Sequence, residues 1–110
     1  MFEVTAMREV RKTLLSKQGY IQLGSHSKKQ MNKRGYTSKD IVRSLLTGNV
    51  TGIERGHNIK LNRICPTLTV EGKDMDDNPI VVILSQEKVN GYLVVTVMPP
   101  INKARFKAVI

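Results

Sequence analysis

The first apolar stripe of the chain recurs at helical spacing. Met7, Val10 and Leu14 stand at positions i, i+3 and i+7, with basic residues between them. This spacing places the three apolar side chains on one side of an amphipathic helix, which we predict over Glu3–Lys17. Gly19 then favours a stop, because glycine readily takes the left-handed conformation that ends many helices.

A second, short helix is predicted over His26–Arg34. Ser25 has the side-chain oxygen that caps a helix N-terminus, and Gly35 provides the C-terminal stop. Met31 is the apolar anchor of this segment and its other side chains are polar, so we expect the helix to lie mostly at the surface.

The clearest local signal belongs to a third helix, predicted over Ser38–Thr47. Thr37 at the N-cap and Asp40 three residues later form the pattern of a capping box. Apolar residues at positions 41, 42, 45 and 46 then form one stripe. We expect Gly48 to end the helix in the left-handed conformation.

After Asn49 the apolar period changes from near 3.6 residues to two, which predicts strands. Helices followed by strands favour an α+β fold, with the N-terminal helices packed on one face of an antiparallel β-sheet of four to five strands. The candidate strands are Val50–Glu54, Asn58–Ile64, Thr67–Lys73, Pro79–Gln86 and Gly91–Met98. The segments 74–79 and 88–91 are short enough to be hairpin loops. Residues 101–110 form either an edge strand or a tail.

The last candidate strand has two different faces. Strict alternation places residues 93, 95 and 97 on one face and residues 92, 94, 96 and 98 on the other. If the helices cover the first face, Tyr92 and Thr96 lie on the second. We expect that second face to remain a shallow, partly polar surface beside the basic first half of the chain.

Charge gives the first indication of function. The chain carries 18 Lys and Arg against nine Asp and Glu, a net charge of +9. Residues 1–63 hold this excess, with 13 basic and four acidic side chains, whereas residues 64–110 hold five of each. Such a balance favours a polyanionic partner, with nucleic acid first and an acidic protein second.

Residues 17–43 concentrate the charge. This segment has a net charge of +6 and contains two predicted helix N-termini, which attract anions. We predict that its cations contact the phosphates of RNA. The residues assigned to RNA binding are Lys28, Lys33, Lys39 and Arg43. The alternative is a solvated helix face that has no ligand.

Several kinds of site are excluded by the residues present. Cys65 is the single cysteine, which rules out an internal disulfide and leaves too few ligands for the common structural zinc sites. The acidic segment 74–77 lacks the glycine and the glutamate of a calcium loop. We therefore expect no metal and no cofactor. The apolar runs are too short to span a bilayer, and no signal peptide opens the chain, which leaves either a cytosolic protein or a piece of a larger exported one.

His26 is the first candidate for chemistry. Steps of four residues along the predicted helix place His26, Gln30 and Arg34 on one side. An imidazole exchanges protons near neutral pH, and a nearby cation stabilises charge on phosphate oxygens. These groups suit metal-independent cleavage of RNA with the substrate's own 2′-hydroxyl as nucleophile. The residues of suitable type are His26, Lys29, Arg34, Tyr36 and Thr96.

Both histidines also have structural interpretations. His26 stands where a hydrogen-bonding residue often begins a helix. His57 lies in the sequence Gly56-His57-Asn58 and is interpreted as a turn residue.

Three stretches of the chain carry a family resemblance. They are residues 26–41 with the Arg34-Gly35 pair, Leu46-Thr47-Gly48, and Val94-Val95-Thr96-Val97. Together they resemble a small bacterial domain family of unknown function, whose members share a His, a helix, an Arg-Gly, a second helix ending in Gly and a meander of strands. The resemblance covers about residues 25–99 of a single domain 1–110, in which 1–24 form an N-terminal helix and connection and 100–110 the edge strand or tail. That family is similar to the barnase, EndoU, colicin and RelE (BECR) superfamily of ribonuclease toxins.

The resemblance implies an antiparallel sheet flanked by N-terminal helices, with a metal-independent ribonuclease site on the open sheet face. His26 and Arg34 match the family's His and Arg, and Thr96 matches the hydroxyl residue of the last strand. Many members have Arg where Gln30 stands, so one phosphate contact is either missing or supplied by Lys29.

The implied activity is that of an endoribonuclease toxin that cleaves tRNA or other structured RNA in the bacterial cytoplasm. It belongs either to a toxin–antitoxin system or to the C-terminal end of a larger secreted or cell-surface protein of contact-dependent growth inhibition. The implied partner is an acidic cognate immunity or antitoxin protein. The alternative function is a noncatalytic nucleic-acid-binding or regulatory module that uses the same basic face.

Overall fold

A computed structural model describes residues 2–100 of the chain and contains, within them, three helices and five strands. The helices are α1 (Phe2–Leu15), α2 (Ser25–Arg34) and α3 (Ser38–Thr47). The strands are β1 (Tyr20–Leu23), β2 (Asn49–Asn58), β3 (Arg63–Lys73), β4 (Pro79–Lys88) and β5 (Gly91–Met98). The predicted α+β class is confirmed, whereas the expectation for residues 101–110 lies outside the described residues.

The five strands form one sheet in the order β1-β5-β4-β3-β2. Strands β2 to β5 form the predicted antiparallel meander. The sheet is nevertheless mixed, because β1 pairs in parallel with β5, from Tyr20 opposite Gly91 to Leu23 opposite Val94. The sequence did not predict β1, since four residues are too few to display an alternating pattern and their partner strand lies far along the chain.

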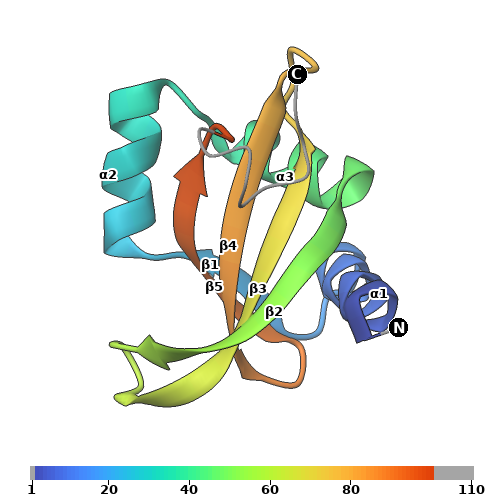
Figure 1. Cartoon of the computed structure of the whole chain (residues 1–110), viewed down its shortest axis with the longest axis vertical. Helices are drawn as coiled ribbons and strands as arrows, with labels where there is room; N and C mark the ends of the chain where they lie inside the picture. The colour runs from blue at the N-terminus through green and yellow to red at the C-terminus, as the bar shows by residue number, and fades with distance from the viewer. Residues whose placement is uncertain (1, 101–110) are drawn as a thin grey trace.

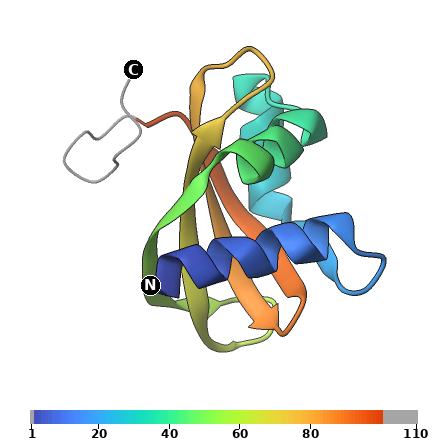
Figure 2. The same ribbon diagram turned by 90° about the vertical axis from the view of Figure 1, so that its right-hand side faces the viewer.

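Helices α1 and α3 lie against one face of this sheet, and α2 lies beside the part of β5 that β1 does not pair with (Figures 1 and 2). The core fills the space between helices and sheet, as expected for a two-layer domain. Its buried residues are Met7, Val10, Met31, Ile41, Leu45, Val50, Leu68, Val70, Ile80, Val82, Leu84, Tyr92, Val94 and Val97. The other side of the sheet, which α1 and α3 do not cover, is called the open face below.

One predicted strand proved to be the turn between two longer strands, β2 and β3. The segment expected as Asn58–Ile64 contains the end of β2, the turn at residues 59–62 and the first residues of β3. The amide of Leu61 donates to Asn58 Oδ1 at 2.9 Å, and Asn62 takes a positive φ of 51°. Both features reverse the chain. The apolar residues of this turn had produced the strand-like pattern.

The helix ends differ from the predictions in their detail. Helix α1 ends at Leu15, and Gly19, with a φ of 85°, precedes β1 instead of ending the helix. Gly48 follows α3 in an extended conformation and not in the left-handed one. The reason is that Arg11 of α1 supplies the cap, since its guanidinium donates to the carbonyl oxygens of Leu45, at 3.1 Å, and of Gly48.

A β-bulge changes which residues of β5 face the helices. Thr96 pairs with Ile83 and Val94 pairs with Leu84, so Val95 is the extra residue. As a result, Tyr92 lies in the helix-covered core together with residues 94 and 97, whereas Thr96 is opposite a residue of the open face. Strict alternation grouped residue 97 with residues 93 and 95, whereas the bulge places it with residues 92 and 94, so the predicted helix-covered face was right for residue 97 and wrong for residues 92–95.

The capping box of α3 is confirmed and extends to a neighbouring loop. Asp40 accepts from the backbone amide of Thr37 at 2.8 Å and from that of Met75 at 2.9 Å. Burial alone would raise the pKa of the Asp40 carboxyl, but these hydrogen bonds and that of the Thr37 hydroxyl hold its pKa below the usual value. The carboxylate therefore ties the start of α3 to the β3–β4 loop.

We predict that Asp40→Asn lowers stability at neutral pH by about 1 kcal/mol, because one amide oxygen replaces two charged acceptors. A lowered folded-state pKa stabilises the protein above the unfolded carboxyl pKa of about 3.9. This stabilisation is lost as the pH falls through the lower folded value. The difference between parent and variant should thus shrink on acidification. Urea unfolding followed by circular dichroism at neutral pH and near pH 3 measures it.

Asp76→Asn is the matched control, since the same exchange at this exposed side chain should change stability little at either pH. An Asp40→Asn difference that is the same at both pH values would contradict the prediction.

Candidate functional site

Helix α2 continues the edge of the sheet where β1 ends. The Gly24 amide donates to the Val94 carbonyl at 3.0 Å, which is the last backbone bond of this edge. The chain turns into α2 immediately afterwards, so Gly24 is the N-cap and Ser25 is the first helical residue. The prediction that Ser25 caps the helix was wrong because the strand needs Gly24 as its final hydrogen-bonding residue. Gly35, with a φ of 77°, ends the helix as predicted.

Beyond this point, side chains of α2 form hydrogen bonds to the backbone of β5. The Ser27 hydroxyl donates to the Val94 carbonyl at 2.8 Å. The Val97 amide donates to Gln30 Oε1 at 3.1 Å, and the Arg34 guanidinium donates to the Val97 carbonyl at 2.8 Å. These three side chains and Met31 lie on one face of the helix, which therefore docks by polar contacts as much as by apolar ones.

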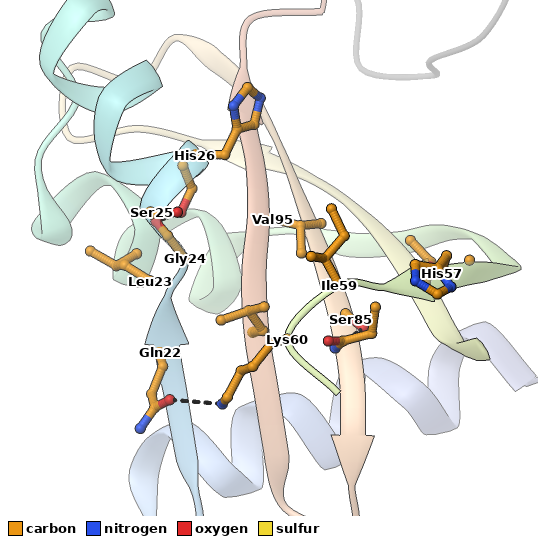
Figure 3. A pocket seen from close by; sticks show the side chains of 15 residues that line it. Gln22, Leu23, Gly24, Ser25, His26, His57, Ile59, Lys60, Ser85 and Val95 are labelled. Carbon is orange, nitrogen blue, oxygen red and sulfur yellow. Dashed lines mark hydrogen bonds between the residues drawn. The ribbon is translucent and has the colours of Figure 1, made fainter. Parts of the chain in front are cut away.

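The open face holds a cleft of about 730 Å³ between the start of α2 and the β2–β3 hairpin (Figure 3). Leu93 and Val95 of β5 form part of an apolar floor, and polar groups stand around it. The residues that line the cleft are Gln22, Leu23, Gly24, Ser25, His26, Ser27, Gly56, His57, Asn58, Ile59, Lys60, Thr67, Ser85, Leu93 and Val95. An apolar cavity with a few polar groups is the usual form of a ligand site.

Two imidazoles border this cleft from different elements. His26 stands in the first turn of α2 and His57 near the end of β2, and both side chains are exposed. In the view of Figure 3, Val95 and Ile59 lie between the two rings. Sequence reasoning treated His57 as a turn residue, and only the pairing of β2 with β3 brings it to the cleft.

A buried carboxylate holds two of the residues that line the cleft, Asn58 and Lys60. Glu87 of β4 is 3% exposed and accepts hydrogen bonds from the hydroxyl of Tyr20 at 2.6 Å, the side-chain amide of Asn58 at 2.9 Å and Lys60 Nζ at 2.9 Å. Asn58 also donates to the Ser85 hydroxyl at 2.9 Å. This network joins β1, the hairpin and β4. No periodicity or motif in the sequence indicated it.

The structure separates the other predicted site residues. Arg34 and Thr96 lie at the far end of α2 and β5, where Arg34 binds the backbone next to Thr96. Lys29 is exposed on α2 and does not line the cleft. Tyr36 packs against the helix-covered core, where burial, followed by the negative charge of Asp74, raises its pKa. Of the five proposed catalytic residues, His26 alone lines the cleft; the assignment of all five remains a prediction.

The predicted RNA-binding cations lie on the solvent sides of α2 and α3. Lys28, Lys33 and Lys39 are exposed, and Arg43 is 3.8 Å from the Asp77 carboxylate, also at the surface. Within residues 2–100, no group of three or more His, Cys, Asp or Glu side chains is arranged to hold a metal ion. None of the described helices is long and apolar enough to cross a membrane.

The fold and the cleft define a small α+β domain with a basic helical edge and two imidazoles on its open face. The model of a family described as a domain of unknown function (DUF4258) matches residues 23–99, and the chain belongs to this family. The resemblance to a family of unknown function over about residues 25–99 is thus confirmed. The further link to the BECR superfamily stays a prediction. No curated protein and no solved structure matches the chain.

The docking of α2 generates a stability prediction. Gln30→Met keeps the length of the side chain but removes the acceptor for the amide of Val97, a residue with no exposed surface. An unpaired buried amide costs about 1–3 kcal/mol, so the free energy of unfolding should fall by at least about 1 kcal/mol. Urea unfolding followed by circular dichroism measures this change.

Lys29→Met is the control, since it makes a similar exchange on the exposed side of the same helix and should leave stability nearly unchanged. Equal unfolding midpoints for the two variants would show that Gln30 is not needed to hold α2 against β5.

Proposed function

We propose that this domain is a metal-independent endoribonuclease that cleaves RNA in the cleft on the open face. The observation that carries the proposal is the presence of two imidazoles, His26 and His57, on two sides of one cleft in a strongly basic chain. Two such groups suffice for proton transfer at both oxygens of the reacting phosphodiester.

The proposed reaction is a transesterification. One imidazole takes the proton of the RNA 2′-hydroxyl, whose oxygen forms a bond to the adjacent phosphorus. The bond from phosphorus to the 5′-oxygen of the next nucleotide breaks, and the second imidazole gives that oxygen a proton. The products are a 2′,3′-cyclic phosphate and a 5′-hydroxyl, so no oxidant or further reactant is needed.

The surroundings of the cleft suit a phosphate backbone. Helix α2 begins at the cleft, and the N-terminus of a helix favours an anion. Lys28 and Lys33 extend from the same helix into solvent. An RNA strand that follows α2 would have its charge neutralised there while one phosphate reaches the imidazoles.

Such an activity is harmful to the cell that makes it, which accounts for the second part of the proposal. The domain acts as a toxin on tRNA or other structured RNA in the bacterial cytoplasm, and an acidic immunity or antitoxin protein holds it inactive. A noncatalytic RNA-binding or regulatory module would use the same basic surface, and the experiment below separates the two.

The test is incubation of the purified domain with total RNA in EDTA, followed by analysis of the fragment ends. We expect 2′,3′-cyclic phosphate ends. His26→Ala and His57→Ala should each lower the cleavage rate by about 10²- to 10⁴-fold, the usual loss for a proton-transfer group. Lys28→Ala should instead weaken RNA binding, because it removes one phosphate contact.

Circular dichroism must show that each variant is folded. Intact RNA with salt-sensitive binding would favour the noncatalytic module. A folded His26→Ala protein that cleaves at the parental rate would rule out the proposed role of His26.

The partner proposal predicts a salt-dependent complex. An acidic inhibitor should cover the surface around Lys28 and Lys33, because this excludes RNA and pairs the same cations. Its association rate should fall as salt is added. Stopped-flow measurements over a range of ionic strength test the rate, and an inhibitor that contacts residues 64–100 alone would contradict the prediction.

A further inference from the structure

The turn between β2 and β3 carries a lysine that a buried carboxylate holds at the cleft. Lys60 Nζ lies 2.9 Å from Glu87 Oε1 and 3.3 Å from Gln22 Oε1. The Lys60 side chain is 45% exposed and lines the cleft, whereas the Glu87 side chain is 1% exposed. Figure 3 shows Lys60 reaching across the open face toward Gln22 of β1.

The carboxylate is fixed in both position and charge. Burial alone would raise the pKa of Glu87, but hydrogen bonds from Tyr20, Lys60 and Asn58 lower it below the usual value. The hydrogen bond to Glu87, followed by burial, raises the pKa of Tyr20 to about 12, so its hydroxyl remains a donor. Lys60 thus has a partner that is ionised at neutral pH and held in place by β4.

The lysine keeps capacity for a ligand despite this partner. An ammonium group has three N–H donors. Two of them reach Gln22 and Glu87, and the ammonium also lies 5.2 Å from the centre of the Tyr20 ring, so one N–H remains without a hydrogen-bond acceptor among these partners. Two further cations lie close by, since the Arg63 guanidinium donates to the Glu87 carbonyl and Lys88 Nζ is 5.5 Å from the centre of the Tyr20 ring.

The local balance of charge therefore favours an anion. Lys60, Arg63 and Lys88 contribute three positive charges around the single negative charge of Glu87. The Lys60 ammonium is the cation of this group that lines the cleft. A structural role for the ion pair, in which it merely ties the turn to β4, would not require its lysine to face the cavity.

We propose that Lys60 binds a non-bridging phosphate oxygen of an RNA strand lying in the cleft, and that Glu87 is the positioning residue that holds Lys60 there. This inference rests on the proposed function, because it names the cation that would stabilise charge on the reacting phosphate. His57 lies three residues before Lys60, so the β2–β3 hairpin places both a proton-transfer group and a cation at the cleft.

The first test measures binding without cleavage. The probe is a short 2′-O-methyl oligoribonucleotide, which lacks the nucleophile and cannot be cut. Lys60→Met should weaken its binding several-fold and reduce the slope of log affinity against log salt by about 0.7, the value for one single-strand phosphate contact. Lys60→Arg should retain the affinity, since arginine is also a cation.

Lys12→Met is the matched control, because it removes the same charge from the exposed side of α1, on the helix side of the sheet. It should leave the salt slope unchanged. A folded Lys60→Met protein with the parental affinity and slope would overturn the role of Lys60. This outcome differs from failure of the proposed function, in which the probe binds through Lys60 but natural RNA remains intact.

The second test separates positioning from simple charge. Glu87→Gln raises the net charge by one, so electrostatics alone would tighten RNA binding and leave turnover intact. If Glu87 positions Lys60, kcat should fall about tenfold while the probe binds at least as tightly. Nuclear magnetic resonance of the Lys60 ammonium provides a readout independent of cleavage, since we expect its slowly exchanging signal in the parent and its loss in Glu87→Gln.

Tyr20→Phe is the control for this variant, because it removes a hydrogen bond to Glu87 but keeps the ion pair and should retain the ammonium signal. A folded Glu87→Gln protein that keeps the Lys60 signal would overturn the positioning role. If Glu87→Gln does not fold, Glu87→Asp replaces it: the shorter carboxylate should also lose the signal, and its persistence would overturn the role equally.

Discussion

The hydrogen-bonding groups along the edge of β5 set the position of helix α2, which forms one wall of the candidate site. Strand β1 satisfies this edge only as far as Val94, and a bare edge beyond that point would invite pairing with another chain. From Val94 onward, helix α2 forms the hydrogen bonds to the backbone of β5, through the side chains of Ser27, Gln30 and Arg34. Because these contacts fix both the distance and the rotation of α2, they also determine where His26 stands on the open face.

The second wall of the cleft depends on a different kind of constraint. The β2–β3 turn is held from beneath by Glu87, whose burial is tolerable only while Tyr20, Asn58 and Lys60 donate to it. One wall is thus secured by side-chain hydrogen bonds to the backbone of β5, and the other by a network around a buried carboxylate. The two imidazoles are therefore positioned by different sets of contacts, His26 through the docking of α2 on β5 and His57 through the contacts of the hairpin with Glu87 of β4.

Local chemistry made part of this structure predictable. The capping box of Thr37 and Asp40 located α3 to the residue, and the change of period after Asn49 separated helices from strands. Features that depend on partners distant in the sequence were not predicted. Strand β1 exists through pairing with β5, and Arg11 replaces the left-handed cap expected at Gly48. At the site, His26 lines the cleft, but His57 and Lys60 reach it only through the hairpin, and Gln30 serves the backbone of β5.

The parallel pairing of β1 with β5 has a consequence for folding during synthesis of the chain. Contacts such as that between Ser27 and Val94 join groups 67 residues apart, so they form after the meander has brought β5 into place. On the ribosome, the segment that contains β1 and α2 emerges before its partner strand β5. Until β5 is made, α2 lacks its partner and the cleft lacks Leu93 and Val95. Assembly of the site is therefore deferred until β5 has been translated, so a partner already present in the cell meets the complete cleft only after that point.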